Sequence, residues 1–202
     1  MPRARHRTGG PRRQRNAAAT RLAILQSARQ AFARAGYAGA GVREIASGAG
    51  VTAMLVNRYF GSKERLFAEA VAESMANTSV LAPQIASAGI SGKAIATALV
   101  GITKADAVPL EGFQIMLRSA ASESAARIGR EQIERHHQKR IAAALRGSLA
   151  PQRAAIMLSL IAGFQVMRQM LELPALAKAD AQTLVKVLAP LFDELLGRHG
   201  RS

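Results

Sequence analysis

The chain has 202 residues, of which 49% are hydrophobic and 4% aromatic, and it contains no cysteine. A chain of this length can bury a substantial core in one or two domains, and the lack of cysteine excludes disulfides and thiolate metal sites. The formal net charge of +15 points to polyanionic partners such as nucleic acid or an anionic lipid surface.

The positive charge is concentrated near the N-terminus. Residues 1–67 hold 13 Lys and Arg against two acids, which gives +11, whereas residues 68–202 hold 15 against 11, which gives +4. No apolar segment follows the first arginines, so they are not a secretory signal. The longest apolar run, 154–164, is too short to span a bilayer. We therefore expect a cytoplasmic protein that does not enter the membrane.

Helical spacing of apolar residues predicts an all-α fold of about nine helices. Turn dipeptides are few and β-branched runs are short. The expected helices cover approximately residues 20–35, 42–49, 52–59, 62–77, 91–106, 109–120, 123–145, 151–173 and 181–196. We expect a disordered, Arg-rich arm over residues 1–16, a DNA-binding domain over 17–67, and a second domain over 68–202, with a linker near 81–92.

Residues 42–60, VREIASGAGVTAMLVNRYF, indicate a helix-turn-helix. Val42, Ile45 and Ala46 lie on one side of the first helix, and Gly50 can adopt the positive φ that the turn requires. The hydroxyl of Thr52 can cap the second helix. In such a unit the second helix enters the major groove of DNA.

The arm over residues 1–16 carries six arginines and no acid. We expect it to be disordered in the absence of a partner. It either follows the DNA backbone into the adjacent minor groove or acts as a nonspecific electrostatic tail, and the sequence favours neither.

One stretch carries a family resemblance: ILQSARQAFARAGYAGAGVREIASGAGVTAMLVNRYFGSKERLFAEAV. It resembles the N-terminal domain of TetR/AcrR-type bacterial transcriptional regulators over about residues 20–72. The shared features are the end of the first helix, the VREIA segment, the AGV turn, the aromatic pair Tyr59-Phe60 and the GSKE segment that begins the fourth helix. The C-terminal half resembles the family only in the number and order of its helices.

Two departures from the family pattern bear on DNA contact. Ala40 and Gly41 stand where the family has a Ser or Thr that caps the second helix and touches a phosphate. Asn57 replaces a tyrosine that often contacts DNA. Asn can pair bidentately with adenine in the major groove, or it can face phosphate or solvent, and both alternatives stay open.

The resemblance assigns roles to the side chains around the turn. Residues toward the groove are Thr52, Ala53, Met54 and Asn57, and Met54 is placed to contact a thymine methyl. Arg58, Tyr59 and Lys63 are expected to hold phosphates, and Arg43 to reach a base edge or a phosphate.

The last two long helices are expected to form a dimer interface. The helix over 151–173 is apolar nearly all round and must be covered on two sides. Leu184, Leu188, Leu191 and Leu195 follow helical spacing in the helix after it. The resemblance implies a homodimer built as a four-helix bundle from these helices, with two recognition helices ~34 Å apart on a pseudo-palindromic operator.

Side chains of the C-terminal half are candidates for a pocket that binds a small-molecule effector, although each also serves as an ordinary core residue. Methionines suit adaptable apolar pockets. Gln165 and Arg168 are polar groups on an otherwise apolar helix; they either orient the polar end of a ligand, which Arg168 would suit if it is anionic, or satisfy each other and a neighbouring helix across the dimer. The candidates are Met75, Ile102, Phe113, Met116, Leu117, Met157, Phe164, Met167 and Arg168.

The resemblance implies a transcriptional repressor that a ligand releases from double-stranded DNA, the fourth helix carrying the change to the recognition helix. An activator, a ligand-independent repressor and a nonspecific DNA-coating protein are the alternatives. The sequence contains no paired carboxylates, nucleophile–base set, phosphate-binding loop or metal-ligand cluster, so we expect neither an enzyme nor a metal or cofactor.

Overall fold

The computed structural model describes residues 11–77, 91–104 and 111–197, and within these ranges it contains helices and turns but no strand. The first part comprises α1 (Pro11–Gly39), α2 (Val42–Gly48), α3 (Ala53–Phe60) and α4 (Lys63–Asn77). The second comprises α6 (Gly92–Ile102), α7 (Glu111–Ser119), α8 (Glu123–Ile133), α9 (Lys139–Ala144), α10 (Ala150–Gln165), α11 (Pro174–Ala177) and α12 (Ala181–Leu195). Two π-helical turns, η1 (Glu134–Gln138) and η2 (Val166–Met170), follow α8 and α10. The all-α prediction is confirmed.

Helix α1 is longer than predicted. It begins at Pro11 rather than near residue 20, so the prediction of disorder is wrong for residues 11–16; residues 1–10 lie outside the described residues. Two properties of the sequence explain the extension. Proline is favoured at the first helical position, and the arginines, glutamine and three consecutive alanines that follow are good helix formers.

Gly36 interrupts α1 where the sequence predicted its end. Its φ of 67° and ψ of −179° are not helical, and the chain is helical on both sides of it. A Cβ at this position would lie 2.4 Å from the carbonyl oxygen of Arg118 on α7. Glycine is therefore required both for the backbone conformation and for the close approach of α7.

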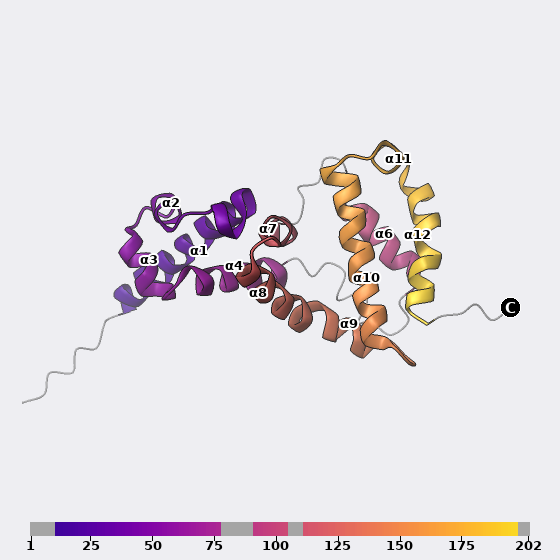
Figure 1. Cartoon of the computed structure of the whole chain (residues 1–202), viewed down its shortest axis with the longest axis horizontal. Helices are drawn as coiled ribbons and strands as arrows, with labels where there is room; N and C mark the ends of the chain where they lie inside the picture. Colours follow the sequence, from indigo (N-terminus) through magenta and orange to yellow (C-terminus); the bar gives the residue numbers. More distant parts are fainter. Residues whose placement is uncertain (1–10, 78–90, 105–110, 198–202) are drawn as a thin grey trace, which may run out of the picture.

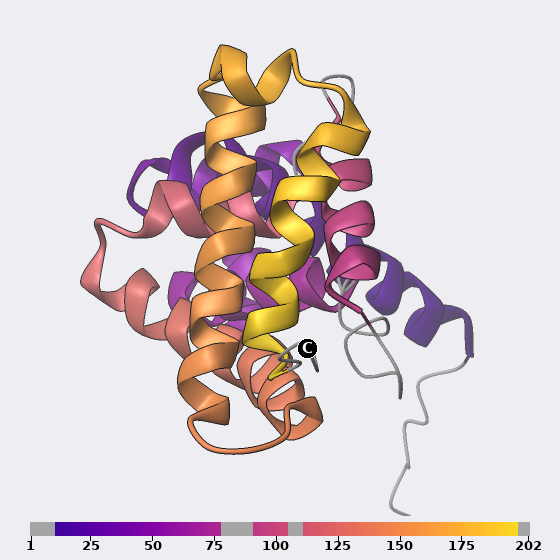
Figure 2. The same ribbon diagram turned by 90° about the vertical axis from the view of Figure 1, so that its right-hand side faces the viewer.

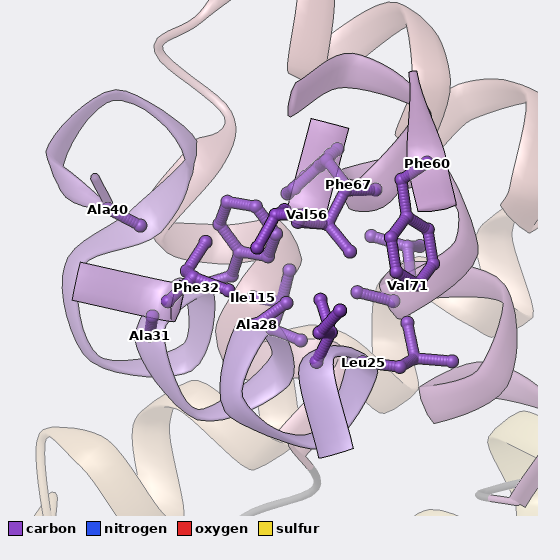
Figure 3. Close-up of a cluster of buried hydrophobic side chains, with 14 of the residues drawn as sticks. Leu25, Ala28, Ala31, Phe32, Ala40, Val56, Phe60, Phe67, Val71 and Ile115 are labelled. Carbon is purple, nitrogen blue, oxygen red and sulfur yellow. The ribbon is translucent and has the colours of Figure 1, made fainter. Parts of the chain in front are cut away.

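The buried hydrophobic side chains form two clusters. The first cluster draws on α1 to α4 and also on Ile115 of α7 and Ile128 of α8. Figure 3 shows its members Phe32, Val56 and Phe67 lying together between these helices. Phe32 and Phe60 are buried here, and Tyr37 packs against the cluster.

The second cluster draws on α6, α9, α10 and α12, with Leu99, Met157 and Phe192 fully buried. We call the helices around each cluster the first lobe and the second lobe. In Figure 1, α1 to α4 of the first lobe run from indigo to magenta, and α10 and α12 of the second lobe are orange and yellow. Residues 123–144 form one continuous helical rod, as predicted, which contributes Ile128 to the first cluster and Ile141 to the second.

The helix predicted over 151–173 is interrupted in the structure. The helix expected over 151–173 ends its α-helical part at Gln165, passes through η2 and is followed by the four-residue α11. Helix α12 continues through Pro190. The linker predicted near 81–92 lies mostly outside the described residues. None of the described helices is long and apolar enough to cross a membrane.

Candidate nucleic-acid interface

Short-range contacts hold α2, its turn and α3 in a fixed arrangement. Gly50 has a φ of 66°, as the turn requires, and the Thr52 hydroxyl accepts a hydrogen bond from the Leu55 N–H at 3.3 Å. Both features were predicted. On the other side of α2, the Ser27 hydroxyl of α1 donates to the Ile45 carbonyl at 2.8 Å. A Cβ at Gly48 would lie 2.4 Å from that hydroxyl oxygen, so glycine permits α1 and α2 to pack closely.

The start of α2 is stabilised without the hydroxyl that the family uses there. The Gly41 N–H instead donates to the Glu44 carboxylate at 3.4 Å. Glu44 also forms an ion pair with Arg34 of α1. The carboxylate thus provides part of a capping box and connects α2 to α1.

Helix α3 has one buried and one exposed face. Val56 and Phe60 are buried, as their spacing of four residues requires. Met54, Asn57 and Arg58 share the exposed face at spacings of three and four residues, and Met54 is 80% exposed. An outward-facing methionine of this exposure has no packing role in the isolated chain.

The other two residues expected in the groove have structural contacts. Ala53 packs against the first cluster, and Thr52 is exposed while its hydroxyl caps α3. The structure therefore brings Met54, Asn57 and Arg58 together as the outward face and places Thr52 and Ala53 at its edge.

The residues expected to hold phosphates lie where α3 meets α4. Tyr59 is half-buried against the first cluster. The Lys63 ammonium lies 4.8 Å from the centre of the Tyr37 ring, and burial lowers the pKa of Lys63. Ser62 caps α4 by accepting from the Arg65 N–H at 3.2 Å. Arg43 is exposed on α2.

Two cations missed by the sequence analysis border the same region. Arg65, the first of them, lines a surface hollow together with the predicted Arg58 and with Tyr59, Gly61 and Glu69. Arg21 of α1 lies over the Phe60 ring at 4.8 Å and pairs with Glu69. The position of Arg65, three residues after the capping Ser62, was the available signal, because it places the side chain on the first turn of α4.

The predicted effector-pocket residues fall into different parts of the molecule. Met75 belongs to the first cluster and Met116 packs against it. In contrast, Met157 and Phe164 belong to the second cluster and Ile102 packs against that one. The remaining candidates are the half-buried Phe113, the exposed Leu117 and Met167, and the buried Arg168.

Comparison with known proteins identifies both halves of the chain. The family model for bacterial regulatory proteins of the tetR family matches residues 24–70. The model for the C-terminal domain of tetracyclin repressor-like proteins matches residues 91–196. None of the curated proteins compared with the chain matches it.

Solved structures share the fold at low sequence identity. A TetR-family regulator from Streptomyces coelicolor A3 is 23% identical, with 96% of this chain and 99% of that chain covered and a TM-score of 0.55. A transcriptional regulator from Pseudomonas aeruginosa PAO1 is 18% identical, with 95% and 93% covered and a TM-score of 0.66. The multidrug binding protein EbrR, solved with proflavin, is 18% identical, with 85% and 99% covered and a TM-score of 0.59.

The two family models together cover most of the described chain, and the helix-turn-helix presents an exposed face beside a group of cations. The chain belongs to the TetR family of bacterial regulatory proteins and is a ligand-responsive, DNA-binding transcriptional regulator.

Proposed function

We propose that the protein is a repressor that binds a pseudo-palindromic operator as a homodimer and leaves it when a small molecule binds the second lobe. The observation that carries the proposal is the exposed face of α3, where Met54, Asn57 and Arg58 have no partner within the first lobe that explains them.

Specific readout would come from two of these side chains. Asn57 has donors and acceptors suited to an adenine edge, and Met54 offers apolar contact to a thymine methyl. Arg43, Arg58, Tyr59 and Lys63 would hold phosphates, joined by Arg65, whose guanidinium lines the hollow next to Arg58. The local excess of positive charge favours this use of the surface.

Uncovered apolar surface on the second lobe supports dimerisation. Ile156 on α10 and Val187 on α12 are 56% and 63% exposed. Figure 2 shows α10 and α12 side by side on the face turned toward the viewer. On α10, Ser159 and Gly163 share the exposed side, and such small residues allow a second helix to approach closely. A second copy of the same face is the simplest cover for it.

Release requires that the ligand bind one arrangement of the dimer more tightly than the other, and the coupling is limited by that difference in affinity. EbrR, a structural neighbour, is a multidrug binding protein solved with proflavin. We infer that this chain likewise acts by binding a small molecule and not by catalysis.

Selection of bound sequences from random DNA tests the proposal. We expect a site with two-fold symmetry whose half-sites lie one helical turn apart or a multiple of it. A nonspecific DNA-coating protein would protect all sequences about equally. Protection of one site, with much weaker binding to other DNA sequences at physiological salt, would exclude that alternative. Recovery of no symmetric site would contradict the dimeric repressor.

A further inference from the structure

Arg168 is the most unusual side chain of the second lobe. It is 7% exposed although it carries a full charge, and buried arginines normally pair with an acid. Among the described residues, no carboxylate lies within ion-pair distance of it. The cation is buried in the second lobe and its charge is not compensated by any described acid.

Within residues 11–77, 91–104 and 111–197, only one end of the guanidinium has hydrogen-bond partners. Nη1 donates to the Val100 carbonyl and to the Thr103 hydroxyl oxygen, each at 2.9 Å. The Thr103 hydroxyl in turn donates to the Leu99 carbonyl at 2.7 Å. These acceptors belong to the C-terminal end of α6, where free carbonyls and the helix dipole favour a cation. They fix the orientation of the guanidinium without neutralising it.

No described residue accepts a hydrogen bond from the opposite edge of the guanidinium. Nε is buried and has no hydrogen-bond partner, and Nη2 lies beside it. The Nε and Nη2 donors form the side-on pair that binds both oxygens of a carboxylate. A buried unpaired donor destabilises the fold. A ligand that accepts hydrogen bonds from Nε and Nη2 would therefore remove that cost.

A second buried donor lies nearby on the same helix. The side-chain amide nitrogen of Gln165 also lacks a partner, and Gln165 is 4% exposed. Gln165 precedes Arg168 by three residues, which places the two side chains on the same side of the helix. Arg168 lies within η2, and single π-helical turns occur frequently at functional sites.

The surroundings restrict the ligand to a singly charged, otherwise apolar molecule. The Phe164 ring lies 5.7 Å from the Arg168 guanidinium carbon, and both Phe164 and Ile102 pack in the second cluster. A dianion would bring one charge more than Arg168 can neutralise, and an uncompensated buried charge is costly. We propose that Arg168 and Gln165 form the polar end of an effector site for an apolar monocarboxylate. This inference rests on the proposed function, because it names the effector class of the regulator.

The test compares carboxylates with their neutral amides, using octanoate with octanamide and phenylacetate with phenylacetamide. Calorimetric titration of the full chain is expected to give at least about tenfold tighter binding for the acid of each pair, the factor that about 1.4 kcal/mol of charge-assisted hydrogen bonding supplies. The Arg168→Met variant should bind acid and amide equally, and Arg168→Lys should keep part of the preference. The exposed Lys186 of the same lobe provides the matched control, because Lys186→Met should leave the preference unchanged.

Three results would overturn the proposal. The first is equal affinity for acid and amide in both pairs. The second is an acid preference that persists in a folded Arg168→Met variant, with folding checked by circular dichroism. The third concerns Asp106, which follows Thr103 by three residues in the sequence and lies outside the described residues. A tenfold gain in octanoate affinity in Asp106→Asn would show that the chain itself supplies the carboxylate. Operator binding is measured separately, so failure of the DNA-binding proposal is distinguishable from failure of this one.

Discussion

We expect the residues that face outward on α3 to contact different parts of the DNA according to their chemistry. Asn57 and Met54 suit base edges, whereas Arg58 carries a charge that suits phosphate. Opposite them, Val56 and Phe60 are buried. Because the buried pair fixes the rotation of the helix, the exposed side chains have a defined direction before DNA arrives, which reduces the entropy lost on binding.

The Asn57→Ala variant should lose discrimination at one base pair in each half-site. A bidentate amide–adenine pair contributes about 1–3 kcal/mol of discrimination. Repeating the selection from random DNA with the variant measures the change, which should appear as one relaxed position in an otherwise unchanged site. A uniform fall in affinity at every position would instead assign Asn57 to a phosphate.

The Lys63→Ala variant should weaken binding about equally for all sequences and lower the slope of affinity against salt by about one. The phosphate contact needs the protonated ammonium, and burial lowers the pKa of Lys63. The contribution of Lys63 is therefore lost as the pH rises, and earlier than that of an exposed lysine. Electrophoretic titration at several salt concentrations and pH values measures both effects. Arg65→Ala should reproduce the salt effect.

Gly36 and Gly50 form a matched pair for testing backbone requirements. Both have a positive φ, but a Cβ at Gly36 would lie 2.4 Å from the Arg118 carbonyl oxygen, whereas nothing lies within 4 Å of one at Gly50. Gly50→Ala should lower the free energy of unfolding by about 1 kcal/mol. Gly36→Ala should lower it by more than about 2 kcal/mol, since steric conflict adds to a conformation reserved for glycine. Urea denaturation compares them, and equal losses would contradict the close contact.

Local signals explain why so much of the recognition unit was predictable. The Thr52 cap, the Ser62 cap and the Gly50 turn each depend on a few neighbouring residues, and the sequence contains them in full. The contacts of Arg168 with Val100 and Thr103 join residues more than 60 positions apart. The sequence identified Arg168 as unusual but contained no indication of its partners.

Helices α10 and α12 carry exposed apolar side chains that we propose are covered in the dimer. Val187→Glu and Leu191→Glu should each shift the protein from dimer to monomer, because a charge would be buried in an apolar interface. Sedimentation equilibrium measures the change. Leu22→Glu is the matched control, since Leu22 is 55% exposed on α1 and lies outside the proposed interface. A wild-type protein that sediments as a monomer would contradict the interface itself.

The spacing of apolar residues predicted the positions of the helices better than it predicted which helices pack against one another. The rod over residues 123–144 and the position of α12 agree with the sequence analysis because their apolar spacing is regular. The pocket candidates illustrate the limit. Met116 and Met157 both lie on apolar faces, but one packs against the first cluster and the other belongs to the second. An amphipathic pattern gives the buried face of a helix and not the identity of its neighbour.

At the scale of the whole molecule, both ends of α7 are fixed to other helices of the first lobe. Glu111 at its start accepts from Arg29 Nε at 2.7 Å and from the Ser74 hydroxyl at 3.3 Å. Ser119 at its end accepts from the Tyr37 N–H at 2.9 Å. The sequence analysis expected α4 to carry a change to the recognition helix. These contacts fix α7 to α1, so a displacement carried along the rod to α8 and α7 would also reach α1, on which α2 and α3 are packed.

The two lobes should therefore open as separate units that different substitutions affect. Glu111→Gln weakens the ion pair with Arg29 in the first lobe, whereas Asp193→Asn weakens the bond from the Gly92 N–H, 2.6 Å long, that joins α6 to α12 in the second. Hydrogen exchange measured by mass spectrometry should accelerate in α1 and α7 for Glu111→Gln and in α6 and α12 for Asp193→Asn. The separate clusters require this division, because few buried apolar contacts pass between them except along the rod. If either substitution accelerated exchange equally in both lobes, the molecule would open as one cooperative unit, and a ligand in the second lobe could reach α3 without passing through α7.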